Sequence, residues 1–136
     1  MALAVGAIAL LGAAVVAVEG LRAGGAALRA AAATNLAADM AGRIRTNRRA
    51  IAAYAGEGPG WDAGCSTVGD PCAPAEVAAD DWFQWQAAIE ARLPRGAAAA
   101  IQLDDGDADG ACPCTVEVNW PEPGAAHPAG VRLVLP

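Results

Sequence analysis

Residues 2–18 read ALAVGAIALLGAAVVAV, and Glu19 is the first charged side chain of the chain. The hydrocarbon core of a bilayer is about 30 Å thick and needs about 20 helical residues, so this run lies at the short end of membrane-spanning helices. A cleaved signal peptide is the alternative, but signal peptides begin with a basic segment, and no basic residue precedes this run. The composition therefore favours a helix that is not cleaved off and that lies in a membrane or in the core of an assembly.

The helical pattern continues well past the apolar run. Alanine remains frequent, no proline precedes Pro59, and larger apolar residues recur at Leu21, Leu28, Leu36, Met40, Ile44 and Tyr54. We expect one helix of about fifty residues, about 75 Å long, whose second half packs on the rest of the domain. Each interior glycine costs about 1 kcal/mol relative to alanine, so a kink or a melted turn is expected at Gly20, Gly24 and Gly25.

The charge distribution gives little support to a broad nucleic-acid surface. The chain has 136 residues and a net charge of −6, and its nine basic residues are all arginine. Most of the acids follow residue 50, whereas most of the arginines precede it, namely Arg22, Arg29, Arg43, Arg45, Arg48 and Arg49. We expect a basic helix joined to an acidic exposed domain.

The arginines and the cysteines point to opposite sides of a membrane. By the positive-inside rule, arginines after the apolar run place the following residues in the cytoplasm. The four cysteines of the small domain instead suit an oxidising compartment. A basic leader upstream of Met1 would remove the conflict, so we expect the precursor to begin upstream of Met1.

A second helix is expected at residues 75–93. The sequence GEGPG at 56–60 ends the first helix and opens a loop, while Pro74 and Pro94 flank the second one. Glu76, Asp80 and Asp81 lie early in the helix, where they would complement its dipole. Its apolar residues recur at spacings of three and four, which predicts one buried face formed by Trp82, Trp85, Ile89 and Leu93.

The last third of the chain alternates in the manner of strands. Val116, Val118 and Trp120 share one face of an extended segment, and the same period returns at Val131, Leu133 and Leu135. We expect a third strand at residues 98–103. The predicted fold class is α+β, with a long N-terminal helix packed on a small antiparallel sheet and an additional helix.

The cysteines predict structural disulfides rather than a metal site or a redox centre. Cys65 and Cys72 flank a turn-rich loop that a bridge would close easily, while Cys112 and Cys114 are too near each other for a relaxed local pair. Pairing between the two segments is also open, since four cysteines allow three connectivities. Zinc binding by all four thiolates is the alternative, but the usual C-x₂₋₄-C spacing is absent.

One acidic motif resembles a calcium loop. Residues 105–110 read DGDADG and supply oxygen ligands at Asp105, Asp107 and Asp109 with a glycine at the turn. The twelfth position of such a loop is Val116, so the bidentate glutamate is missing. A solvated acidic turn is the favoured interpretation, and no cofactor is expected.

Residues for hydrolytic catalysis are scarce. His127 is the one histidine and lies in a loop rich in proline, glycine and alanine, while Ser66 is the one serine. No catalytic triad can be assembled from these side chains, and no glycine-rich phosphate loop is present. The chain is therefore not expected to be an enzyme.

The order of these elements resembles the minor pilins of bacterial type IV pili, specifically the PilV-like prepilins. The most specific segments are LAADMAGRIRTN at residues 36–47 and CTVEVNW at 114–120, with a cysteine loop and the pair Trp82/Trp85 between them. The resemblance implies a pilin-like fold with residues 1–26 as the membrane or fibre-core part of the helix and 27–136 as the globular domain. The family's cleavage motif, a glycine followed by Phe-(Thr/Ser)-Leu-x-Glu, is missing.

The resemblance implies a structural subunit that acts by assembly. Its partners would be other minor and major pilins, and a prepilin peptidase if a leader precedes Met1. It would sit in the inner membrane as a single-pass protein with a periplasmic domain, and later in an extracellular pilus. A type II secretion pseudopilin and an anchored extracytoplasmic module for adhesion, DNA or calcium are the alternatives. Contacts with other pilin helices are expected at Leu10, Leu11, Val15 and Val16.

Overall fold

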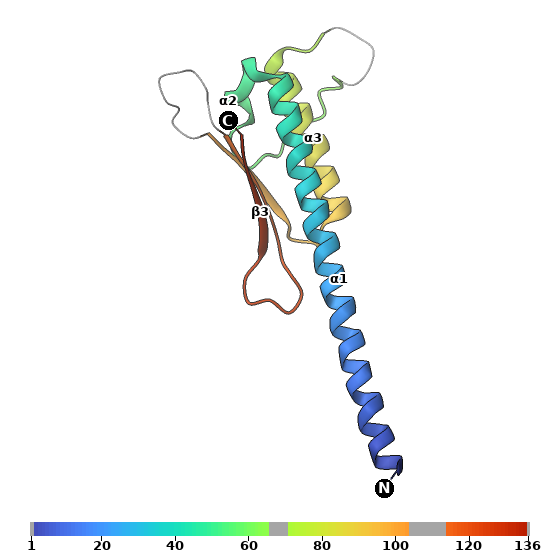
Figure 1. Cartoon of the computed structure of the whole chain (residues 1–136). Coiled ribbons are helices and arrows are strands. Elements are labelled where there is room, and N and C mark those ends of the chain that lie inside the picture. Colours follow the sequence, from blue (N-terminus) through green and yellow to red (C-terminus); the bar gives the residue numbers. More distant parts are fainter. Residues whose placement is uncertain (1, 66–70, 104–113, 136) are drawn as a thin grey trace.

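The long N-terminal helix is the spine of an α+β domain (Figure 1). The computed structural model describes residues 2–65, 71–103 and 114–135, with side chains from residue 12 onward. Its elements are α1 (Ala2–Thr46), η1 (Arg48–Ala50), α2 (Ile51–Tyr54), α3 (Pro74–Arg92), β1 (Ala98–Leu103), β2 (Cys114–Trp120) and β3 (Ala129–Leu135). The C-terminal half of α1 contacts β2 and β3 on one side and α3 on another. The α+β class predicted from the sequence is thereby confirmed.

Helix α1 differs from the expected helix at two places. It runs without interruption through Gly20, Gly24 and Gly25, where a kink was expected, because the surrounding alanines are the strongest helix formers. It ends at Thr46, whereas the pattern predicted a helix to Tyr54. Asn47 leaves the helical conformation at φ −117° and ψ 41°, and its side-chain amide donates to Pro74 O at 2.7 Å. The apolar pattern resumes in η1 and α2 after this break.

Helix α3 matches the predicted second helix. Pro74 opens it, and the Glu76 carboxylate accepts a hydrogen bond from the Ala73 N–H at 2.8 Å, which stabilises its first turn. The predicted apolar face is buried in the core, with exposed fractions from 0% to 7% for Trp82, Trp85, Ile89 and Leu93. Trp85 also donates its indole N–H to Leu36 O at 2.8 Å, which fixes α3 against α1.

The sheet is antiparallel in the order β1-β2-β3. Its register aligns Ile101 with Val116 and Val116 with Leu133 across the three strands. Val116, Val118 and Trp120 are buried against the helices, as the alternation predicted, whereas the opposite face of β2 carries the polar residues Thr115, Glu117 and Asn119. The core is therefore shared between this sheet face, α3 and residues 33–44 of α1.

No helix within the described residues is long and apolar enough to cross a membrane.

Candidate functional site

The part of α1 that precedes the domain is an exposed helix. Every side chain from residue 12 to residue 24 is exposed, and Figure 1 shows this part of the helix standing clear of the sheet and of α3. The segment includes Val16 and Leu21, which expose 73% and 78% of their surface. Contiguous exposed apolar surface of this kind marks a site of association with other molecules. We call residues 12–24 the exposed segment.

Two of the four predicted assembly residues can be placed on the exposed segment. Val15 is 62% exposed and Val16 is 73% exposed, so both are available for contacts outside the chain. The side chains of Leu10 and Leu11 lie outside the described residues, and their role stays a prediction. The one ion pair within the segment joins Arg22 to Glu19 at 2.9 Å in open solvent, where such pairs contribute little to stability.

An ion pair joins α1 to the loop after β2, just beyond the exposed segment. Arg29 donates from Nε to Glu122 Oε2 at 3.0 Å and from a terminal nitrogen to Glu122 Oε1, so the contact is bidentate. The indole N–H of Trp120 donates to the same carboxylate at 2.9 Å. The hydrogen bond from Arg29 and the one from Trp120 hold the pKa of Glu122 below its ordinary value. The loop after β2 is thereby tied to the helix.

This pair predicts a pH dependence of stability. Because the folded-state pKa of Glu122 is lowered, its contribution is complete above the ordinary carboxyl pKa and is lost as the pH falls through the folded-state value. The variant Glu122→Gln should melt below the parent at neutral pH, and the difference should shrink as the pH falls below the ordinary carboxyl pKa. Thermal melts of both proteins across this range test the effect, with Glu90→Gln on the exposed side of α3 as the control. A difference that is constant with pH would contradict it.

A second polar cluster joins α1, α2 and α3. Arg43 donates to Asp39 at 3.0 Å and to Asp81 at 2.9 Å, and Tyr54 donates its hydroxyl hydrogen to Asp81 at 2.5 Å. Burial, followed by the hydrogen bond to Asp81, raises the pKa of Tyr54 far above its ordinary value. The tyrosine therefore stays neutral at any physiological pH, and the cluster acts as a structural link between the three helices.

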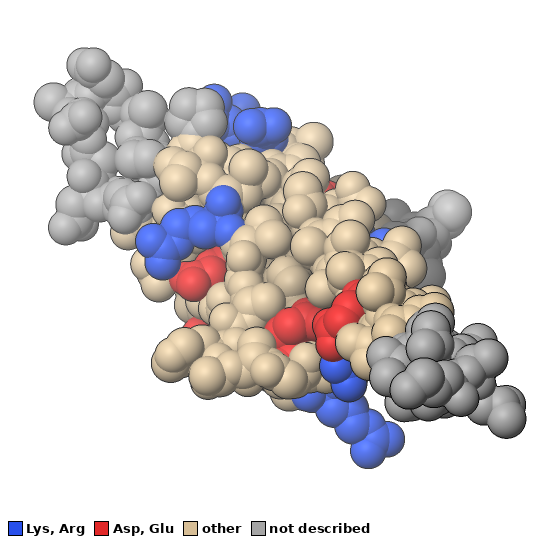
Figure 2. All heavy atoms as spheres, turned by 60° about the horizontal axis from the view of Figure 1, so that its bottom comes forward, with Lys and Arg blue, Asp and Glu red and all other residues tan. Residues whose placement is uncertain are grey.

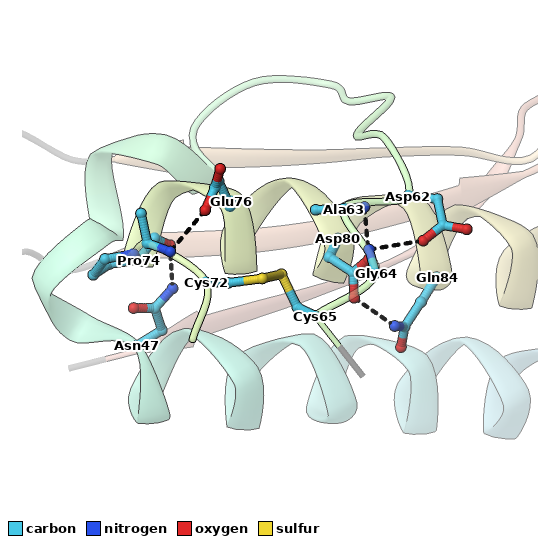
Figure 3. Close-up of a disulfide and its surroundings, with 11 residues drawn as sticks. Asn47, Asp62, Ala63, Gly64, Cys65, Cys72, Pro74, Glu76, Asp80 and Gln84 are labelled. Carbon is cyan, nitrogen blue, oxygen red and sulfur yellow. Dashed lines mark hydrogen bonds between the residues drawn. A yellow bond between two sulfur atoms is a disulfide. The ribbon is translucent and has the colours of Figure 1, made fainter. Parts of the chain in front are cut away.

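The loop between Cys65 and Cys72 is closed by a disulfide, and the segment before it is held to α3 by a buried carboxylate (Figure 3). Cys65 and Cys72 form a disulfide with their Cα atoms 5.8 Å apart, which removes these two thiolates from the alternative zinc site. Asp80 is 4% exposed, and its oxygens accept from the Ala63 N–H at 3.0 Å and from Gln84 Nε2 at 2.7 Å. The predicted role of Asp80 at the helix dipole is thus secondary to its role in holding this loop.

The structure describes only some of the other predicted site residues. Asp105, Asp107, Asp109, Cys112 and Ser66 lie outside the described residues, so the calcium loop and the second disulfide stay predictions. Cys114 is buried in β2, and His127 is exposed in the loop before β3. Among the described residues no group of three or more histidine, cysteine or acidic side chains could hold a metal ion.

On the face shown in Figure 2, arginines and acids form small separate groups among uncharged residues. No known protein family matches the sequence, and neither a characterised protein nor a solved structure matches the chain significantly.

Proposed function

We propose that the chain is a structural minor pilin, a PilV-like subunit involved in the assembly or function of a type IV pilus. The observation that carries the proposal is the division of α1 into two halves. The exposed segment presents apolar side chains to the outside, while residues 33–44 of the same helix contribute buried side chains to the domain core. A subunit built this way contributes one half of its helix to an assembly and uses the other half to carry its domain.

The exposed segment gains free energy when neighbouring helices cover it. Fully burying a valine or leucine side chain contributes about 1.5–3 kcal/mol, and Val15, Val16 and Leu21 are each more than half exposed in the single chain. The exposed segment is rich in alanine and contains Gly12 and Gly20, and such small residues allow helices to approach closely. These features support packing among several parallel or inclined helices, as a fibre core requires.

The proposal also covers location. The chain would be held in the inner membrane by its N-terminal helix, with the domain in the periplasm, and would later move into an extracellular pilus. The disulfide between Cys65 and Cys72 supports an oxidising compartment, since such bridges are rare in the cytosol. The proposed partners are other minor and major pilins, with a prepilin peptidase as the processing enzyme if a leader precedes Met1.

A charge placed in the exposed segment should block incorporation into the fibre. In cells that encode the chain, we expect Val16→Asp to lower its amount in sheared pili at least tenfold, because a buried unpaired carboxylate costs several kcal/mol. The matched control is Val134→Asp on β3, where the valine is 59% exposed and outside the exposed segment. Immunoblots of sheared pili and of the membrane fraction separate failed incorporation from failed membrane insertion.

The proposal would be contradicted by the parent chain being absent from sheared pili while it is present in the cell. It would also be contradicted by normal incorporation of Val16→Asp. Co-purification of the chain with components of a type II secretion system would instead identify a pseudopilin.

A further inference from the structure

The outer face of the sheet carries a polar groove that the assembly proposal does not use. The groove has a volume of about 350 Å³, which is within the range of small-molecule sites. Its floor is formed by residues 97–100, all alanine. Its walls carry five polar side chains from four segments of the chain, namely Glu57, Gln86, Gln102, Glu117 and Asn119. We call this the sheet groove.

The backbone brings these segments together. Gly56 forms an antiparallel bridge with Ile101, with two backbone hydrogen bonds of 2.8 Å, so Glu57 is carried over the outer face of β1. Ala100 pairs in register with Glu117 on β2. Adjacent strands are about 4.8 Å apart, so the backbones of Glu57 and Glu117 lie on either side of β1 at about twice that distance from each other. The groove is therefore built by tertiary structure and not by one loop.

Much of the hydrogen-bonding capacity of the groove is unused. In the part of the chain that the structure describes, the side chains of Glu57, Gln86 and Gln102 make no hydrogen bond or ion pair. Asn119 Nδ2 donates to Glu117 Oε1 at 3.1 Å, which orients both groups at the opposite wall. The three amides offer donors and acceptors at different points around the groove, and the two carboxylates offer further acceptors.

We propose that the sheet groove binds a neutral saccharide. A sugar hydroxyl is both donor and acceptor, so a ring bearing several hydroxyls matches a wall of amides and carboxylates. The alanine floor leaves room for the apolar face of the ring to lie close to the sheet. The proposal does not depend on the assembly function, since the groove is complete within one chain.

The charges and hydrogen-bonding groups of the groove favour a neutral ligand over an anionic or a cationic one. Glu57 and Glu117 would repel nucleic acid and acidic sugars. Arg132 donates to Glu117 at 3.4 Å and is the one ion-pair partner of either carboxylate among the described residues. A cationic side chain of a protein partner would satisfy the carboxylates but would offer no acceptor to the N–H donors of Gln86 and Gln102. A neutral polyol uses both kinds of group.

An exposed tryptophan adjoins the groove. Glu57 also lines a neighbouring hollow of about 190 Å³ that includes Trp61, whose side chain is 60% exposed. The loop that carries Trp61 is held in place on both sides, by the close approach of Gly60 to Ala79 and by the hydrogen bond from Ala63 to Asp80. An exposed indole on an anchored loop offers a flat apolar surface on which a second sugar ring of an oligosaccharide can stack.

The test titrates the full chain with neutral glucose tetrasaccharides in β-1,4 and α-1,4 linkage and follows amide resonances of the groove. We expect at least one of the two to shift the side-chain amides of Gln86, Gln102 and Asn119, with a Kd below about 10 mM. Trp61 fluorescence should change in the same titration. Gln86→Ala and Gln102→Ala should each weaken binding at least tenfold, while the matched control Glu90→Ala, one turn beyond Gln86 on α3, should bind as the parent does.

Four results would overturn the proposal. They are the absence of any shift with both tetrasaccharides, shifts confined to residues outside the groove, unchanged affinity in both glutamine variants, and shifts produced by lysine amide but not by the saccharides. The last result would assign the groove to a cationic protein partner. Circular dichroism melts of each variant confirm that the fold is kept, so that a loss of binding reports on the groove.

Discussion

Replacement of Trp85 by alanine should lower the free energy of unfolding by about 3–5 kcal/mol, since a large cavity replaces a fully buried indole. Trp85 lies between α1 and α3, and its ring stacks edge-on against Trp82 with centroids 5.1 Å apart. Its N–H also bonds to Leu36 O, so the variant loses a buried hydrogen bond in addition to the packing. Urea denaturation of the full chain, followed by far-ultraviolet circular dichroism, measures the change.

Two control variants separate the sources of this loss. Trp85→Phe keeps most of the ring volume but removes the N–H, so it should cost less than the alanine variant. Phe83→Ala lies on the same helix at a position that is 45% exposed, and it should change stability by less than about 1 kcal/mol. Equal effects of the alanine substitutions at 83 and 85 would show that α3 does not pack on α1 as described.

Periodicity was enough to predict the elements whose residues face one continuous core. The spacing of Trp82, Trp85 and Ile89 identified the buried face of α3, and the alternation around Val116 and Val118 identified the buried face of β2. In both cases the apolar residues are close together in the sequence and all of them pack on the same hydrophobic core. A regular spacing of apolar residues is enough to predict such a face.

The end of α1 could not be predicted from the same kind of pattern. Apolar residues continue through Ile51 to Tyr54, so the sequence resembles an unbroken helix. The break at Asn47 depends on two bonds of its side-chain amide, to Pro74 O at 2.7 Å and to the Tyr54 hydroxyl at 3.2 Å. Asparagine competes with the helical backbone when such partners exist, and Pro74 reaches it only after the chain has folded back.

The polar sites could not be predicted either, because their partners are distant in the sequence and meet only in the folded chain. Asp80 resembles an acid in the first turns of a helix until the loop at residues 61–65 covers it. The Arg29–Glu122 pair joins positions 93 residues apart, and the sheet groove combines side chains from four segments. The sequence does contain one indication of buried polarity, the Asp80–Gln84 spacing of four on a helix, which favours a side-chain hydrogen bond.

Replacement of Gly60 by alanine should destabilise the domain, whereas the same change at Gly42 should not. A Cβ atom at Gly60 would lie 1.8 Å from Ala79 O and 2.7 Å from the Cβ of Trp82. Neither neighbour is the flexible end of a side chain, so the loop must move away from α3, at an expected cost of about 1–3 kcal/mol. This displacement should also move Trp61 and weaken the hydrogen bond from Ala63 to Asp80.

The same glycine-to-alanine change at Gly42 should stabilise the domain. It lies exposed on α1, and a Cβ there would meet nothing within 4 Å, so Gly42→Ala should raise the free energy of unfolding by up to about 1 kcal/mol through helix propensity. Urea denaturation of both variants gives the two signs directly. Equal stability of the two variants would mean that the loop at residue 60 does not approach α3 closely. A loss confined to Gly60→Ala, accompanied by a change in Trp61 fluorescence, would show that the contact with Ala79 sets the position of the exposed indole.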